Sequence, residues 1–197
     1  MRRMSRVSAR QNDNRMMKYA RIFIAALLLA SGLAAHAGDD ALRHATDVMC
    51  LLPDATALGV AIAKHDNEGL KQLGLSTATC LVVNYGLELC IRKDRPDGTG
   101  HHAFPSTHTA VAFNGSTFLM RRYGWKWGVP AYVMSSFVAW GRVKSDRHDW
   151  WDVLGGTAIG AGSAFIFTRP FTGNVDVSIA PTTFGDEGYG LTATIQF

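Results

Sequence analysis

The sequence has few cysteines, and their number and spacing exclude two kinds of stabilised fold. Only three occur among 197 residues, Cys50, Cys80 and Cys90. An odd number leaves at least one unpaired within the chain, so no disulfide framework holds this fold. The spacing also matches no zinc ribbon. We expect all three to be small side chains in a hydrophobic core rather than redox groups.

The sequence also has no basic run in its body, which argues against a nucleic-acid-binding protein. The formal net charge is +4, but residues 1–37 hold seven Arg and Lys against one acid, so the rest of the chain carries −2. A weakly acidic body does not offer the positive surface that DNA or RNA requires. With 47% hydrophobic and 18% charged residues, the composition fits one folded domain without repeats or low-complexity segments.

The first 37 residues have the pattern of a secretory signal. A basic front precedes the apolar run 22–30, and small residues follow, ending in Ala35-His36-Ala37. This is the order of an n-region, an h-region and a cleavage site, which would place cleavage before Gly38. The apolar run is shorter than the ~20 residues that span a bilayer, which favours a cleaved signal. An uncleaved anchor is the alternative. We expect a signal peptide or anchor in 1–37, a helical domain in 38–170 and a tail in 171–197.

Beyond the leader, five apolar stretches predict helices, over 49–63, 70–91, 103–120, 129–141 and 153–167. Asn67 and Asp146 are expected N-terminal caps, Pro130 suits a first helical turn, and Gly124 is a stop signal. Several stretches are apolar almost all round, which places them in a protein core or in lipid. Most run for ~14–18 residues, and the best candidate for a membrane span is 70–91.

The tail changes to a period of two, which is typical of strands. Val175, Val177 and Ile179 alternate with polar residues, and the alternation resumes from Tyr189 to the C-terminus. Turn-forming residues lie between the two runs, so we expect a C-terminal β-hairpin within 171–197. An outer-membrane barrel is a weaker interpretation, because one hairpin cannot close a barrel.

Three polar clusters interrupt the apolar stretches, each near a predicted helix end. They cover 92–97, 104–109 and 142–152. Such ends suit an anion, because helix N-termini present free N–H groups and Arg presents a planar fork of donors. Ser106 is an expected N-cap, which would leave the N–H groups of Thr107 and His108 pointing out of the helix. The alternative is an ordinary capped helix with a surface histidine.

The last cluster contains a histidine and an aspartate with catalytic spacing. His148 and Asp152 are four residues apart on a predicted helix, which would place them on one face. The carboxylate would hold one ring nitrogen and leave the other free for nucleophilic attack. A structural hydrogen bond is an alternative. Half of a metal site is another, although no short ligand spacing links the pair to His101, His102 or His108.

Taken together, the three clusters resemble the superfamily of type 2 phosphatidic acid phosphatases (PAP2) and vanadium haloperoxidases. Its signature is K-x6-R-P, then P-S-G-H, then S-R-x5-H-x3-D, and the resemblance runs from Glu88 to Asp152. It implies an all-α fold class. The expected architecture is a helical bundle of the PAP2 and haloperoxidase type over about 41–168, followed by the short β-hairpin.

The resemblance also implies a role for each matched residue. His148 would take the phosphoryl group as nucleophile, Asp152 would orient it, and His108 would protonate the leaving oxygen. The phosphate would be held by the side chains of Arg95 and Arg142 and by the backbone at Ser106 and Thr107. A water activated by His108 would then release phosphate. The scheme requires no metal and no other cofactor.

Three positions depart from the signature. Glu88 stands in place of its lysine, Thr107 in place of its glycine, and Gly141 in place of its second serine. We expect Arg92 to supply the missing cation while Glu88 pairs with it, because both would lie on one helical face with Arg95.

The function implied is an exported phosphatase acting on a phosphate monoester or pyrophosphate, of a lipid such as phosphatidic acid or a polyprenyl pyrophosphate. It would be embedded in or associated with a membrane and face the periplasm, with a soluble periplasmic protein as the alternative. The rival functions are a vanadate-dependent haloperoxidase and a catalytically silent envelope protein.

Four tryptophans near helix ends fit an interfacial belt, a wall for a lipid tail or core filling: Trp125, Trp127, Trp150 and Trp151.

Overall fold

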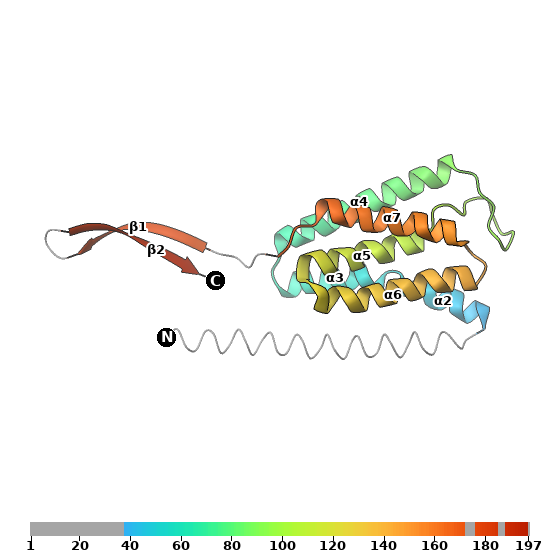
Figure 1. Ribbon diagram of the computed structural model, residues 1–197, viewed down its shortest axis with the longest axis horizontal. Helices are drawn as coiled ribbons and strands as arrows, with labels where there is room; N and C mark the ends of the chain where they lie inside the picture. The colour runs from blue at the N-terminus through green and yellow to red at the C-terminus, as the bar shows by residue number, and fades with distance from the viewer. Residues whose placement is uncertain (1–37, 172–175, 185–187, 197) are drawn as a thin grey trace.

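The computed structural model describes residues 38–171, 176–184 and 188–196, and in these ranges the chain is a helical bundle followed by two strands (Figure 1). The predicted signal segment, 1–37, lies outside the described residues. The helices are α2 (Asp39–Met49), α3 (Leu52–Ala63), α4 (Asn67–Cys90), α5 (Thr107–Tyr123), α6 (Trp125–Lys144) and α7 (Trp150–Phe167).

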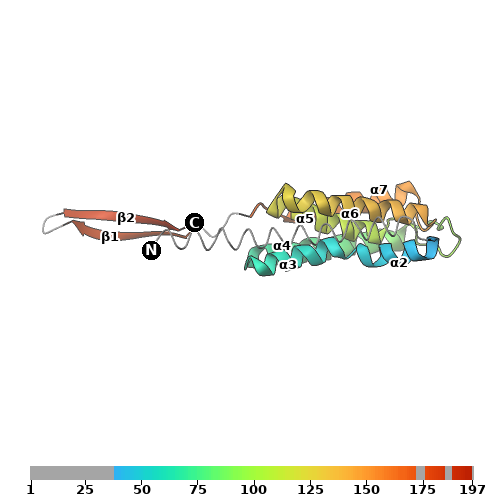
Figure 2. The ribbon, with the colours of Figure 1, turned by 90° about the horizontal axis from the view of Figure 1, so that it is seen from below.

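Helix α5 is the centre of the bundle. It packs against α3, α4, α6 and α7, and Figure 2 shows α2, α3 and α4 in one layer and α5, α6 and α7 in the other. Glycines on α7 let this helix pack closely against α5. A Cβ at Gly156 would lie 2.4 Å from the carbonyl oxygen of Ser106, and one at Gly160 would lie 2.0 Å from that of Ala110. Both α5 and α7 begin at the end of the bundle where α4 and α6 finish (Figure 1), so three polar segments meet there.

The boundaries differ from the sequence prediction at several helix starts. Helix α6 begins directly after Gly124, whose positive φ of 87° separates it from α5. Pro130 therefore lies inside the helix and not in its first turn. The side chains that cap α4 and α7 are Asp66 and Asp149, not Asn67 and Asp146. In both cases the real cap is the Asp whose carboxylate reaches a backbone N–H of the first turn.

Helix α2 was not predicted, because its residues are largely polar. Its buried face is carried by Leu42, Thr46 and Met49, spaced by four and three residues. The hydroxyl of Thr46 donates to the carbonyl of Leu42 at 3.0 Å, which satisfies it within the helix. The guanidinium of Arg43 reaches the carbonyl of Ser145 at 3.0 Å. These contacts seat α2 against the end of α6.

Polar residues inside the apolar helices are paired across helix interfaces. The amide of Asn114 on α5 donates to Thr77 at 2.9 Å and to Asp54 at 3.2 Å. The hydroxyls of Ser116 and Ser135 lie 2.6 Å apart between α5 and α6. Small and polar residues of this kind join helices where no water is present.

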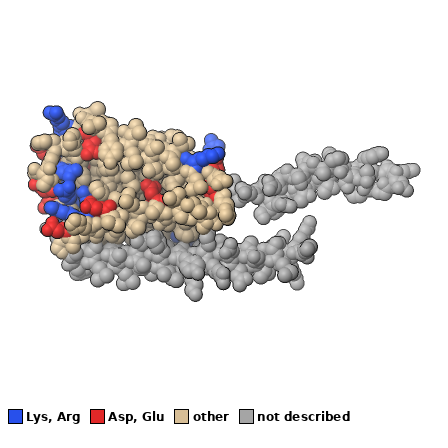
Figure 3. Space-filling model, turned by 180° about the vertical axis from the view of Figure 1, so that it is seen from behind, with Lys and Arg blue, Asp and Glu red and all other residues tan. Residues whose placement is uncertain are grey.

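The face of the bundle seen in Figure 3 is largely apolar between two charged ends. Figure 3 shows charged side chains gathered at the two ends and a broad middle with few of them. Two stretches of 24 residues, Asp40–Ala63 and Asn67–Cys90, are long and apolar enough to cross a membrane. In the second, only 22% of the most apolar window is buried, whereas the core helix of a soluble protein is mostly buried. By length and composition, these two segments fit membrane spans.

The cysteines and the C-terminal strands complete the fold. Cys50 and Cys80 are buried, but Cys90 is exposed, so the prediction of three core cysteines is wrong for the residue that ends α4.

Strands β1 (Asp176–Phe184) and β2 (Gly188–Gln196) pair antiparallel, with Phe184 opposite Gly188. They occupy the segment in which the sequence predicts a hairpin.

Candidate active site

His148 lies in the turn between α6 and α7, and not on a helix as predicted. Helix α7 begins after its cap Asp149, so a histidine one residue earlier cannot be helical. The backbone N–H groups of Arg147 and His148 both donate to the carbonyl of Arg142, at 3.1 and 3.2 Å. Asp146 supplies the left-handed φ of 55° that this reversal uses. The turn holds His148 beside the last turn of α6.

The imidazole of His148 is fixed by a backbone carbonyl. Its Nδ1 lies 2.8 Å from the carbonyl oxygen of Ala103 and 3.6 Å from Oδ2 of Asp152. A carbonyl can only accept, so Nδ1 carries the hydrogen and Nε2 carries the lone pair. The expectation that the aspartate holds the ring nitrogen is therefore corrected: Ala103 makes the hydrogen bond, and Asp152 stands next to it.

Burial keeps this ring neutral. The side chain of His148 is only 4% exposed, and burial, followed by the nearby guanidinium of Arg142 and then that of Arg95, lowers its pKa to about 3. A neutral imidazole with Nδ1 tied and Nε2 unprotonated is the form that attacks phosphorus.

Asp152 is completely buried and makes two hydrogen bonds at the start of α7. Its Oδ2 accepts from the N–H of Asp149 at 3.0 Å, which closes a capping box. Its Oδ1 accepts from Nζ of Lys93 at 2.7 Å, and the same Nζ donates to Asp149 at 2.6 Å. Although partial burial opposes the charge, these hydrogen bonds raise the pKa of Lys93. The sequence reasoning gave Lys93 no role.

Arg142 and His108 meet on a carboxylate that the sequence analysis missed. Oδ1 of Asp47 lies 2.5 Å from Nη1 of Arg142 and 3.1 Å from Nε2 of His108. Arg142 is 3% exposed, while Asp47 is 45% exposed. Asp47 belongs to no motif. No local pattern indicated it, because its contacts with Arg142 and His108 arise from the tertiary packing of α2.

Three guanidinium groups at this end, those of Arg43, Arg95 and Arg142, retain unused donors. The Nε atoms of Arg95 and Arg142 are buried and have no hydrogen-bond acceptor among the described residues. Arg95 lies in the loop after α4, which is tied to the His148 turn by an ion pair of 3.1 Å between Asp97 and Arg147. Hydrogen bonds from Thr99, together with Arg147, lower the pKa of Asp97 to about 2. Buried guanidinium donors of this kind fit an oxyanion.

At the start of α5, Ser106 does not have the role expected for it. It occupies the N-cap position, but its side chain makes no capping hydrogen bond, and its hydroxyl accepts from Thr109. Its N–H donates to the carbonyl of Asp152 at 3.0 Å. The donors left for an anion are the N–H groups of Thr107 and His108, because the first turn of a helix has no internal acceptors.

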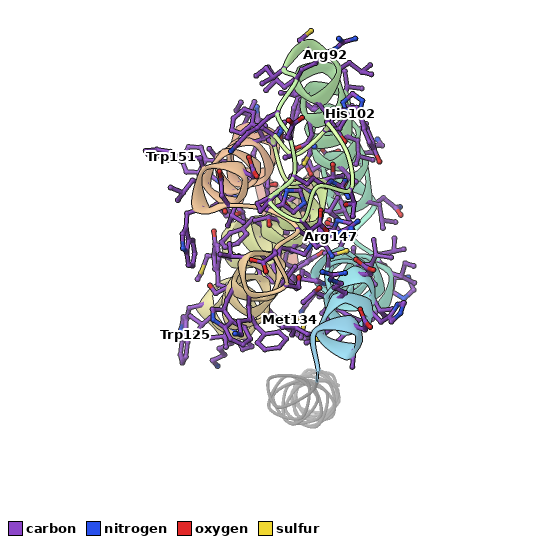
Figure 4. All side chains as sticks on the ribbon, turned by 90° about the vertical axis from the view of Figure 1, so that its right-hand side faces the viewer. Arg92, His102, Trp125, Met134, Arg147 and Trp151 are labelled. Carbon is purple, nitrogen blue, oxygen red and sulfur yellow. The ribbon has the colours of Figure 1, made fainter. Side chains whose placement is uncertain are left out.

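The first two departures from the signature contact each other. The hydroxyl of Thr107 accepts from the amide of Asn84 at 2.7 Å and donates to the carboxylate of Glu88 at 3.3 Å. Arg92 does not pair with Glu88, and the prediction of a shared helical face is wrong because α4 ends at Cys90. Figure 4 shows Arg92 at the outer rim, beside the end of α4, and Arg147 nearer the middle of this end.

The third departure follows from the packing of α2. A Cβ at Gly141 would lie 2.6 Å from Cγ2 of Thr46, so a serine there would push α2 away. The glycine thus permits the contact that brings Asp47 to Arg142.

Sequence comparison agrees with this geometry. The family model described as PAP2 superfamily matches residues 79–176, a range that includes Arg95, His108, Arg142 and His148. The chain belongs to the PAP2 superfamily. It is therefore a phosphatase of the PAP2 type.

Among curated relatives, the lipid A 4'-phosphatase of Helicobacter pylori is 27% identical over 199 residues, covering 92% of this chain and all of that protein. The lipid A 1-phosphatase of Porphyromonas gingivalis is 41% identical over 69 residues, which are 34% of this chain and 16% of that protein. A solved transmembrane PAP2-type phosphatidylglycerolphosphate phosphatase of Bacillus subtilis covers 81% of this chain and 84% of its own, with a TM-score of 0.47 and 21% identity.

Proposed function

We propose that this chain hydrolyses a phosphate ester of a membrane lipid through a phosphohistidine at His148. The observation that carries the proposal is the state of that ring. It is buried, its Nδ1 is tied to the carbonyl of Ala103, and two guanidinium groups with unused donors lie within electrostatic range. A fixed neutral nucleophile beside a preorganised anion site is what phosphoryl transfer requires.

In the first step Nε2 of His148 attacks phosphorus and the bond to the leaving oxygen breaks. Arg95 and Arg142 hold the equatorial oxygens, and the N–H groups of Thr107 and His108 add donors from the helix end. The imidazole of His108 gives its proton to the leaving oxygen. In the second step a water attacks the phosphohistidine, His108 takes a proton from it, and inorganic phosphate leaves.

In this scheme Asp47 connects the general acid, His108, to Arg142, which holds the phosphate. One carboxylate oxygen contacts Nε2 of His108 and Nη1 of Arg142, so it holds both groups in a single arrangement. Burial, followed by the guanidinium of Arg142, lowers the pKa of His108 to about 4, and the carboxylate of Asp47 opposes this shift.

The charge distribution supports an orientation in the membrane. At the end opposite the site, segments 64–71, 121–126 and 168–171 contain six basic residues against two acids. At the site end, segments 40–47, 91–102 and 142–152 contain seven of each. Basic residues collect on the cytoplasmic side of membrane proteins. We therefore place the site on the opposite, periplasmic face, which agrees with the signal predicted in 1–37.

The substrate class follows from the surface around the site. Trp150 and Trp151 begin α7 and are exposed, and Trp125 is exposed at the other end, as expected of aromatic residues at the two membrane interfaces. Trp127 instead packs against the core. A phosphate at the site would lie at headgroup depth, beside the apolar middle of the bundle. The names of the curated relatives, which are lipid A phosphatases, support the same class.

The test is phosphate release by the full chain purified in detergent. The substrates are a phosphorylated lipid A, phosphatidylglycerolphosphate, phosphatidic acid, a polyprenyl pyrophosphate and a soluble aryl phosphate. The matched variants are His148→Ala, at the proposed nucleophile, and His101→Ala, an exposed histidine in the loop after α4.

We expect release from at least one lipid phosphate, its loss in His148→Ala and its retention in His101→Ala. Equal turnover by His148→Ala and the wild type would refute the nucleophile. Release from the aryl phosphate alone would refute the lipid substrate. Peroxide-dependent halide oxidation with bound vanadate, and no phosphate release, would instead support a haloperoxidase.

A further inference from the structure

We propose that Lys93 is a positioning residue for the nucleophile: it fixes both groups that face Nδ1 of His148 and neutralises the carboxylate beside it. The proposal rests on the proposed role of His148. It assigns a function to a lysine that lies outside the family signature, five residues after the position where the signature lysine is replaced by Glu88.

The backbone of Lys93 places the hydrogen-bond acceptor of the histidine. The carbonyl of Lys93 accepts from the N–H of Ala103 at 3.0 Å, and its own N–H donates to the carbonyl of His101 at 3.1 Å. These two bonds close the loop after α4 on itself. The next group along the chain, the carbonyl of Ala103, accepts from Nδ1 of His148. The loop therefore contacts the ring through the carbonyl of Ala103, the residue whose N–H is bonded to Lys93.

The side chain of Lys93 places the group on the other side of Nδ1. Its ammonium lies 2.6 Å from Oδ2 of Asp149 and 2.7 Å from Oδ1 of Asp152. The first carboxylate caps α7, and the second is fully buried with its other oxygen 3.6 Å from Nδ1. One residue thus joins the loop after α4, the cap of α7 and the carboxylate that faces the nucleophile.

The charges around the ring explain why a cation is needed at this position. His148 is faced by Arg142 from α6, Arg95 from the loop and His108 from α5, all of which disfavour a proton on the ring. Asp152 from α7 is the carboxylate beside the ring, and it favours a proton there. With Lys93 in place, the charge of Asp152 is shared with an ammonium, and the ring remains neutral and bonded to Ala103.

Without the lysine, the buried carboxylate would still lie 3.6 Å from the imidazole, with its negative charge no longer offset by the ammonium. An unscreened carboxylate within 4–6 Å raises the pKa of a histidine by about 1–3 units. The ring would then hold a proton at Nε2 over more of the pH range and lose its nucleophilic form. The chemistry of the step would be intact, but it would require a higher pH.

The experiment compares Lys93→Met, Lys93→Arg and Arg92→Met in the full chain. Methionine keeps the length and removes the charge, and arginine keeps the charge. Arg92→Met removes an adjacent cation that lies exposed at the rim. Lys93→Gln serves as a second neutral variant if the methionine variant does not fold. The readouts are the pH profile of phosphate release and, independently of turnover, the titration of His148 by NMR of histidine-labelled protein. The His148 signal is assigned by its absence in His148→Gln.

In both neutral Lys93 variants we expect the titration of His148 and the acid limb of the pH profile to move upward by about 1–3 units. Lys93→Arg and Arg92→Met should keep the wild-type profile. An unchanged titration in folded Lys93→Met, or an equal shift in Arg92→Met, would overturn the proposal. A shifted titration in a protein that releases no phosphate from any substrate would uphold the role of Lys93 and refute the proposed function.

Discussion

Replacing Gly160 by alanine should separate the two helices that carry the site. An ideal Cβ at this position would lie 2.0 Å from the carbonyl oxygen of Ala110 and 3.0 Å from the backbone nitrogen of Asn114. Ordinary van der Waals contact begins at 3.4 Å, so α7 and α5 would have to move apart by about 1.4 Å. Both contacts are with backbone, which cannot rotate away. Overpacking of this kind costs roughly 1–3 kcal/mol of unfolding free energy.

Gly162→Ala is the matched control, because a Cβ there meets nothing within 4 Å. Alanine is favoured over glycine in a helix by about 1 kcal/mol, so the control should be slightly stabilised. The two variants should therefore differ by roughly 2–4 kcal/mol. At ~2–4 °C per kcal/mol for a chain of this size, this is a gap of roughly 5–15 °C in Tm.

The assay is thermal unfolding in detergent, followed by circular dichroism. Phosphate release below the Tm should also fall in Gly160→Ala, since α5 carries His108 and α7 carries Asp152. Melting temperatures of the two variants within about 2 °C of each other would show that the close approach of α5 and α7 does not constrain this position.

Three further predictions concern charged groups. Asp66→Ala should lower the unfolding free energy by about 3–5 kcal/mol in chemical denaturation, because it leaves the buried guanidinium of Arg122 unpaired; a loss under 1 kcal/mol would contradict this. Asp47→Ala should lower kcat by ~10–100-fold with a smaller change in KM, since it removes a hydrogen bond between charged groups. Asp40, on the same helix, has a highly exposed side chain, so Asp40→Ala should leave kcat unchanged. His148 is neutral when folded, with its pKa lowered to about 3, but titrates near 6.5 when unfolded. Its contribution to stability is complete above pH ~6.5 and is lost as the pH falls toward 3, so the Tm of His148→Gln should fall less than that of the wild type on acidification.

The helices and the residues of the signature could be predicted from the sequence, because both depend on local information. Apolar runs of sufficient length give helices wherever they are buried, and the order of the polar clusters identifies the family. Helix α2 could not be predicted in the same way, because its stability comes from packing Leu42, Thr46 and Met49 against the rest of the bundle. Asp47 was missed with it, since a carboxylate that functions through tertiary contact leaves no local pattern.

The orientation of His148 was predicted wrongly for a related reason. Four-residue spacing indicates a shared face only if both residues are helical, and the Asp149 cap starts α7 one residue after the histidine. The sequence contained the cap, but three aspartates in 146–152 could each have served. In the structure Asp149 is the cap, and Lys93, which is distant in sequence, donates to both Asp149 and Asp152. Tertiary contacts thus set the hydrogen bond from Nδ1, although the proposed nucleophile could be selected from the motif.

The departures from the signature are explained by the contacts that surround them. Read singly, Glu88 has the wrong charge for a phosphate ligand and Thr107 crowds the helix end. In the structure the hydroxyl of Thr107 donates to Glu88 and accepts from Asn84, so each departure satisfies the other and the pair joins α4 to the start of α5. Gly141, likewise, leaves the space that Thr46 fills. Because each change is matched by a contact from another helix, the three positions are adaptations of one bundle end and give no support to a loss of activity. Arg95 and Arg142, the two arginines of the signature, are retained, and their buried Nε donors have no acceptor within the described residues.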